Sequence, residues 1–109
     1  MEITVENQTG AVYVVPKGDV DLSCSRDLQS RLKKVLEPKP GRVVVDLSGV
    51  PYMDSSGVAT LVEAMQIARK QATKLILCAM QDKVRSIFEI ARLDRVFTIV
   101  GSRDEAAKV

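Results

Sequence analysis

The alternation of apolar and polar residues at the start of the chain predicts a β-hairpin. Ile3 and Val5 alternate with polar neighbours, which is the period of a strand with one face in water. Residues 7–10 carry the Asn and Gly of a turn, and an apolar run follows at 11–15. Because so short a connection joins neighbouring antiparallel strands, we expect residues 2–6 and 11–15 to pair.

Later in the chain, short apolar runs alternate with stretches whose apolar residues recur at helical spacing. The runs at 42–47, 75–79 and 96–100 predict further strands, and the first of them is apolar on both faces, as in a strand buried between layers. The stretches before each run predict amphipathic helices with one apolar stripe. Their apolar positions are Leu28, Leu32, Val35 and Leu36, then Val58, Leu61, Val62 and Met65, then Val84, Ile87, Phe88 and Ala91.

Polar residues mark the expected start of each helix, because their side chains accept hydrogen bonds from the free N–H groups of a first turn. Ser23 or Ser25 is expected to cap the first helix, and Asp82 the third. The second helix is expected to begin in the turn 54–57, and Ser102 to start a fourth, terminal helix.

The predicted order is strand, strand, helix, strand, helix, strand, helix, strand, helix. The later alternation implies right-handed βαβ crossovers and parallel strands, and the opening hairpin makes the sheet mixed. A chain of 109 residues suits one domain with an independent core. We therefore expect an α/β fold in a single domain, residues 1–109, with a mixed β-sheet covered by about four helices.

Composition removes several classes of chemistry. The chain has no histidine, which excludes Ser-His-Asp and Cys-His catalysis and every metal site that uses histidine. Cys24 and Cys78 lie far apart and form no CxxC pair, so both are expected to be reduced thiols, with Cys78 in the core. The glycine patterns of P-loop and dinucleotide sites are missing. We expect no metal, no cofactor and no enzymatic activity.

Charge and apolar length indicate where the protein works. Sixteen basic residues against fourteen acidic ones give a net charge of +2, too balanced to indicate nucleic acid or an anionic membrane as a partner. The start of the chain has no signal-peptide pattern, and no stretch approaches the length of a bilayer span. We expect a soluble cytoplasmic protein, a monomer or weak dimer, without membrane insertion.

Residues 46–61 are the candidate functional site. They leave the buried strand at 42–47, cross a short loop and enter a helix whose first turn contains Ser55. A hydroxyl there is expected at the surface, at the carboxyl end of a central strand, where open α/β sheets usually place their sites. The positive end of the helix dipole also tolerates a phosphate. Since a serine or aspartate at a helix start is most often only a cap, the pattern indicates a position and not yet a function.

Four segments of the sequence carry a resemblance to a known family. They are Gly18–Asp21, Val43–Leu47, Tyr52–Val58 and Val84–Phe97. They look like the STAS domain, and more narrowly like the bacterial anti-sigma factor antagonists, over nearly the whole chain. The string Met53-Asp-Ser-Ser-Gly57 is the most specific element. The sequence departs from the family in two places. At 70–74 it lacks the paired glycines that are common in the family. At Arg92 the family has a glycine, so backbone strain is expected at this arginine if its φ is positive.

The resemblance implies regulation by partner switching. An unmodified antagonist binds an anti-sigma factor that is also a serine kinase of the GHKL type, and this binding frees a sigma factor. The kinase phosphorylates the serine directly after the motif's aspartate, which is Ser55 here, and a PP2C-type phosphatase reverses the modification. Asp21, Asp54, Ser56 and Gly57 fall on the motif positions that belong to the partner-binding site.

Two other functions stay open at this point. A STAS domain can also be a docking subunit of a lipid-transport ABC complex or of a stressosome-like scaffold, in which Ser55 need not be phosphorylated. A small enzyme is disfavoured, because histidine, metal clusters and phosphate-binding loops are all missing from the sequence. The anti-sigma factor antagonist is the function we expect.

Overall fold

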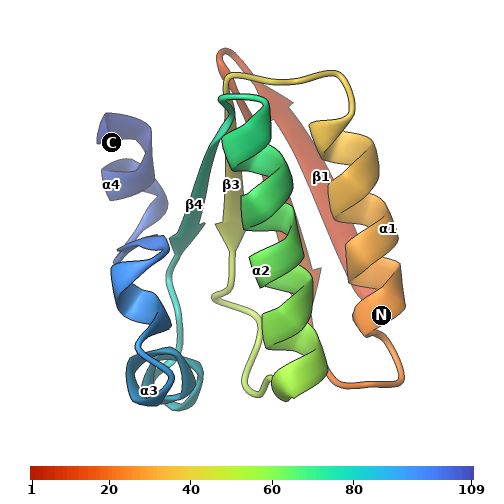
Figure 1. Cartoon of the computed structure of the whole chain (residues 1–109), viewed down its shortest axis with the longest axis vertical. Coiled ribbons are helices and arrows are strands. Elements are labelled where there is room, and N and C mark those ends of the chain that lie inside the picture. Colours follow the sequence, from red (N-terminus) through yellow and green to blue (C-terminus); the bar gives the residue numbers. More distant parts are fainter.

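The computed structural model describes residues 1–109, which form a five-stranded sheet with helices on both faces (Figure 1). The strand order is β1-β2-β3-β4-β5, with β1 and β2 antiparallel and each later pair parallel. The predicted α/β fold, with its hairpin, mixed sheet and four helices, is confirmed. The strands are β1 Glu2–Gln8, β2 Ala11–Lys17, β3 Arg42–Asp46, β4 Lys74–Cys78 and β5 Thr98–Val100; the helices are α1 Ser25–Leu36, α2 Ser55–Lys70, α3 Asp82–Ile90 and α4 Arg103–Lys108, with a 3₁₀ turn η1 at Leu93–Arg95.

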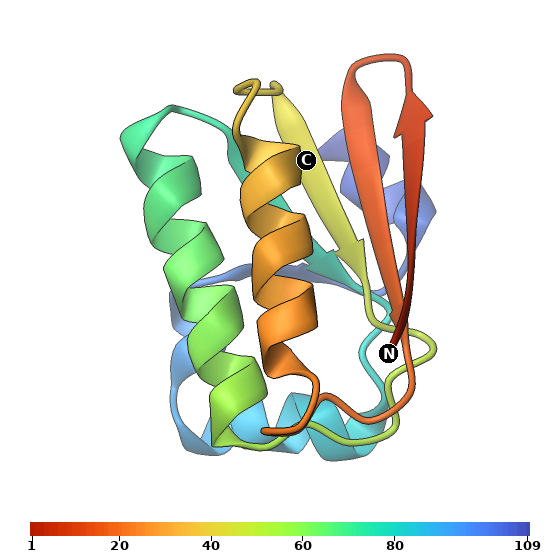
Figure 2. The same cartoon turned by 90° about the vertical axis from the view of Figure 1, so that its right-hand side faces the viewer.

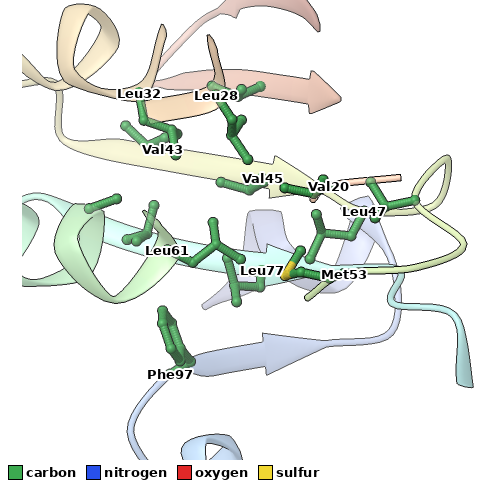
Figure 3. Close-up of a cluster of buried hydrophobic side chains, with 14 of the residues drawn as sticks. Val20, Leu28, Leu32, Val43, Val45, Leu47, Met53, Leu61, Leu77 and Phe97 are labelled. Atoms are coloured by element: carbon green, nitrogen blue, oxygen red, sulfur yellow. The ribbon is translucent and has the colours of Figure 1, made fainter. Parts of the chain in front are cut away.

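Strand β3 is buried on both faces, as its continuous apolar run predicts. Val43 and Val45 belong to the larger core cluster, which α1 and α2 cover, while Val44 belongs to a smaller cluster that includes Ala106 of α4. Figure 2 shows α1 and α2 on one face of the sheet and the end of the chain on the other. Figure 3 shows Leu28 and Leu61 packing toward the sheet in the larger cluster. The fully buried strand fixes where its carboxyl end, and the loop that follows it, must lie.

Two of the predicted helix caps are wrong. Cys24 occupies the cap position of α1, and its side chain makes no capping hydrogen bond. Ser25 is already the first helical residue, and the Ser23 hydroxyl donates to Asp21 instead. The cap position of α3 is Gln81, whose side chain instead donates to the Ser48 carbonyl, and Asp82 lies inside the first turn. The remaining cap is confirmed: the Ser102 hydroxyl accepts from the Glu105 N–H at 3.2 Å.

The last strand is shorter than predicted. It begins at Thr98 because the two preceding residues close the 3₁₀ turn, with the N–H groups of Val96 and Phe97 both donating to the Leu93 carbonyl at 3.0 Å. Phe97 instead packs edge-to-face on Phe88, with the ring centroids 5.5 Å apart. The run therefore supplies apolar surface to the core without pairing over its full length.

The two departures from the family sequence coincide with left-handed backbone. Arg92, between α3 and η1, has φ of 59°, and Ala72, in the loop between α2 and β4, also has φ of 59°. The strain expected at Arg92 is confirmed, and such a conformation costs about 1–2 kcal/mol for a residue with a Cβ. Ala72 lies just past the last residue of α2, Lys70, at the opposite end of the helix from Ser55. None of the helices combines the length and apolar character that crossing a bilayer requires.

Candidate functional site

The segment after β2 and the segment after β3 run side by side at one edge of the sheet, where α1 and α2 begin (Figure 2). The Val20 N–H donates to the Tyr52 carbonyl at 3.0 Å, and the Asp54 N–H donates back to the Val20 carbonyl at 3.1 Å. Val20 and Met53 pair in parallel register. This short ladder brings together Asp21 and Asp54, which lie far apart in the sequence.

Asp54, and not Ser55, is the cap of α2. One carboxylate oxygen, Oδ1, accepts from the N–H groups of Ser56 and Gly57 at 2.9 and 3.3 Å, and from the Ser56 hydroxyl at 2.6 Å. The other oxygen, Oδ2, accepts from the Leu22 N–H at 3.1 Å. Asp54 therefore satisfies the first turn of α2 and also fastens the loop after β2 to it.

Ser55 is the first residue of α2 and is exposed. Its hydroxyl takes part in none of the side-chain hydrogen bonds that hold this turn, which all run through Asp54 and Ser56. A group attached to that oxygen enters solvent at the positive end of the helix dipole. The position predicted from the sequence is thus open to chemical modification without disruption of the cap.

Two carboxylates give the surface around Ser55 a negative charge. A hydrogen bond from the Ser56 hydroxyl is the main reason that the pKa of Asp54 lies below its ordinary value. Hydrogen bonds from the hydroxyl and the N–H of Ser23 lower the pKa of Asp21, although the charge of Asp54 acts in the opposite direction. Both groups are ionised at neutral pH, so any further negative charge here meets like charges.

Gly57 lies beneath this surface. A Cβ at this position would lie 2.6 Å from Met53 Cγ and 2.8 Å from Val20 Cγ1, closer than side chains approach one another. The absence of a side chain lets α2 begin directly against the Val20–Met53 pair. Of the predicted site residues, Asp21, Asp54, Ser55 and Ser56 therefore meet at one edge, and the buried Gly57 supports them from below.

A charged cluster near α4 was missed by the sequence reasoning. Arg103 Nε donates to Asp46 Oδ2 at 2.6 Å, its other nitrogens donate to the Glu6 carboxylate at 3.0 and 3.2 Å, and its guanidinium lies 5.0 Å from the Tyr13 ring centroid. Burial acts to raise the pKa of Asp46, but hydrogen bonds from the Ser48 backbone and from Arg103 outweigh it and lower the pKa. The cluster ties α4 to the sheet, and the polar Asp46 after an apolar run was its one sequence signal.

The surface around Ser55 is not a cavity. The largest hollow, about 660 Å³, lies between the hairpin turn at Gly10, the start of β3 at Arg42 and the end of α4. None of the hollows on the molecule is lined by Asp21, Asp54, Ser55 or Ser56. No group of three potential metal ligands gathers anywhere in the chain. An exposed, acidic and shallow surface suits contact with another macromolecule better than enclosure of a small substrate.

Comparison with known proteins relates the whole chain to one family. The model of the STAS domain matches residues 2–106. The anti-sigma-B factor antagonist of Listeria monocytogenes is 30% identical over 95 residues, covering 86% of this chain and 82% of that protein. An anti-sigma factor antagonist from Mycobacterium paratuberculosis has the same fold, with a TM-score of 0.91 and 23% identity over 98% of this chain and 91% of its own. The Bacillus cell fate determinant SpoIIAA, solved in its phosphorylated form, aligns with a TM-score of 0.75 and 17% identity over 98% of this chain and 97% of its own.

Proposed function

The chain belongs to the STAS domain family and, within it, to the anti-sigma factor antagonists, and from this premise we propose that Ser55 switches its binding to an anti-sigma factor. In this proposal the unmodified protein binds an anti-sigma factor that is also a serine kinase of the GHKL type, and a sigma factor is released. Phosphorylation of Ser55 ends the complex, and a PP2C-type phosphatase restores the binding form. The protein acts in the cytoplasm as a binding partner and not as a catalyst.

The observation that carries this proposal is the position of Ser55 between solvent and two ionised carboxylates. A phosphoserine carries roughly −1.5 to −2 charges at neutral pH. The start of α2 accommodates that charge in the free protein, because it is exposed to water and carries the positive end of the helix dipole. A partner packed over Ser55 must instead remove water from a dianion that lies beside Asp54.

The size of this effect is sufficient for a switch. Like charges brought together at an interface cost several kcal/mol, and each 1.4 kcal/mol corresponds to about tenfold in affinity. A loss on the order of a thousandfold is therefore expected without a change of fold. The phosphorylated form of SpoIIAA is a precedent in a structural neighbour, since that protein was solved with its modification and still aligns with this fold.

The other predicted residues have distinct parts in the proposal. Asp21, Asp54 and Ser56 lie at or near the partner-facing surface, with Asp54 and Ser56 also holding the first turn. Gly57, which is buried, supports the surface by allowing the close approach of α2 to Val20. The partner is accordingly expected to place cationic groups against Asp21 and Asp54 but none over Ser55, so that a phosphate there loses its water without gaining a counter-charge.

Mapping the phosphate by mass spectrometry tests the modification. Incubated with its cognate anti-sigma kinase and ATP, the wild-type protein is expected to gain one phosphate, on Ser55. Ser55→Ala is expected to gain none, while the matched variants Ser56→Ala and Ser23→Ala are expected to gain one. A phosphate found on Ser56 or Ser23, or none on any residue, contradicts the proposal and favours a docking subunit of a transport or scaffold assembly.

A further inference from the structure

One exposed apolar side chain is tied directly to the proposed switch. Leu22 is 78% exposed and Ile90 is 83% exposed, but only Leu22 has a backbone hydrogen bond to a residue of the site, Asp54. Single exposed apolar residues are common on protein surfaces and require no function by themselves. Leu22 differs because its position is determined by the same carboxylate that caps α2.

The backbone around Leu22 is held on both sides. Its own N–H donates to Asp54 Oδ2 at 3.1 Å. The Asp21 carbonyl before it accepts from the N–H groups of Cys24 and Ser25 at 3.1 and 2.8 Å, and the Asp21 side chain accepts from the Ser23 N–H at 3.0 Å. The side chain is therefore presented to solvent from a fixed loop, so little backbone freedom is lost when a partner covers it.

A backbone hydrogen bond places Leu22 close to Ser55. The Leu22 N–H donates to Asp54 Oδ2 at 3.1 Å, and Asp54 is the residue directly before Ser55. Tyr52, which directly precedes Met53 in the sequence, is 47% exposed. Leu22, Asp54 and Ser55 thus lie close together at the surface, and Asp21 directly precedes Leu22 in the same loop.

We infer that Leu22 is the apolar anchor by which this protein holds its anti-sigma factor, in an apolar pocket of the partner that is bordered by basic side chains. The inference rests on the proposed function. It adds Leu22, which supplies binding affinity, to Ser55, whose phosphorylation controls binding. The basic border is required by the ionised Asp21 and Asp54, which any occupant of the patch must face. A phosphate on Ser55 lies next to the anchor, so the partner cannot cover Leu22 without also covering the dianion.

The two contributions are distinguishable by kinetics. Rim charges mainly set the association rate and its dependence on salt, while a buried anchor mainly sets the dissociation rate. Leu22→Ala is therefore expected to raise the dissociation rate from the anti-sigma factor about tenfold or more, with an unchanged salt dependence of association. Leu22→Met, which keeps an apolar side chain of similar volume, is expected to stay within about threefold of the wild type.

A remote apolar residue provides the matched control. Val96 is 39% exposed and lines a hollow with Met65 and Arg69 at the far end of α2. Arg69 follows Ser55 by 14 residues (69 − 55), which is about 21 Å along the helix. Val96→Ala is accordingly expected to leave binding unchanged. The melting temperature of each variant is measured first and is expected to equal that of the wild type, so that a loss of binding cannot come from unfolding.

Surface plasmon resonance of the full-length variants on the immobilised anti-sigma factor decides between the outcomes. A dissociation rate for Leu22→Ala within twofold of the wild type, while Ser55→Asp abolishes binding, overturns the anchor and leaves the switch standing. An equal rise in the dissociation rate for Leu22→Ala and Val96→Ala also overturns the anchor. Failure of the wild type itself to bind overturns the proposed function, and the anchor with it.

Discussion

The packing of Gly57 leads to a quantitative prediction, that a single added methyl group disturbs the start of α2. A Cβ at Gly57 would lie 2.6 Å from Met53 Cγ, 2.8 Å from Val20 Cγ1 and 3.0 Å from the Val20 carbonyl oxygen. Val20 and Met53 are both fully buried, and the Val20 carbonyl already accepts from the Asp54 N–H. Neither neighbour can move away without breaking other contacts.

Two opposing effects set the magnitude of Gly57→Ala. Overpacking of a well-filled core costs about 1–3 kcal/mol. Replacing glycine by alanine within a helix stabilises it by at most about 0.8–1 kcal/mol. Because two of the three contacts lie below 3.0 Å, the upper part of the overpacking range applies, about 2–3 kcal/mol. The net expectation is a loss of about 1–2 kcal/mol in the free energy of unfolding, or a fall in melting temperature of roughly 4–16 °C.

The same substitution at Gly41 is the matched control. No atom lies within 4 Å of a Cβ built there, and its φ is not in the left-handed region. Gly41→Ala is therefore expected to be neutral or slightly stabilising. Both variants are measured by urea unfolding followed by circular dichroism. A Gly57→Ala protein that is as stable as Gly41→Ala would refute the argument that close packing requires glycine at this position.

Three further substitutions test other parts of the structure. Val44→Asp is expected to prevent folding, because it places an unpaired charge in a strand buried on both faces; a cooperative melt in circular dichroism would contradict this. Arg92→Gly is expected to raise the free energy of unfolding by about 0.5–1 kcal/mol, because glycine relieves the strain of the left-handed backbone. Arg95→Gly is the control: Arg95 does not have a positive φ, so glycine there is expected to lower the free energy of unfolding. Asp54→Asn keeps a capping side chain but removes the charge. Because the pKa of Asp54 is lowered in the folded protein, the contribution of its charge is complete above its unfolded pKa and is lost as pH falls through its folded pKa. In urea titrations, the stability gap between wild type and Asp54→Asn is thus expected to be largest near neutral pH and to close in acid, and a gap independent of pH would be the contrary result.

The fold was predictable because its signals are local and repeated. The run Val43–Val45 is apolar at every position, which indicates a strand covered on both sides, and the two core clusters on its faces confirm this. The stripe beginning at Leu28 likewise gives the buried face of α1. Periodicity of this kind reports burial directly, and burial is what the strands and helices of this sheet have in common.

Caps and charged contacts were less predictable because they depend on neighbours distant in sequence. Ser23 has the chemistry of a cap, yet its hydroxyl is taken by Asp21, whose place is set by the ladder to the segment after β3. Arg103 contacts Glu6 and Asp46, which are 97 and 57 residues away in the chain. No local pattern records such pairs, since only the folded sheet brings them together.

The candidate site lies between these cases. The start of α2 and the exposure of Ser55 followed from the strand-to-helix pattern. The division of labour within the turn did not, because the sequence Asp54-Ser-Ser56 offers three capping side chains and only the geometry shows that Asp54 takes the cap. The exposure of Leu22 was also hidden, since its surroundings carry no distinctive motif.

The switch at Ser55 is tested most directly by calorimetric titration of three variants against the anti-sigma kinase. Ser55→Asp is expected to lose binding by on the order of a thousandfold while keeping the wild-type circular dichroism spectrum and melting temperature, because the added carboxylate is exposed and compatible with the helix dipole. Ser55→Ala is expected to bind as the wild type does. Thr9→Asp adds the same charge at the exposed hairpin turn, at the opposite edge of the sheet, and is expected to bind normally. Equal affinities of Ser55→Asp and Ser55→Ala would contradict the account, because charge at Ser55 would then not control the partner.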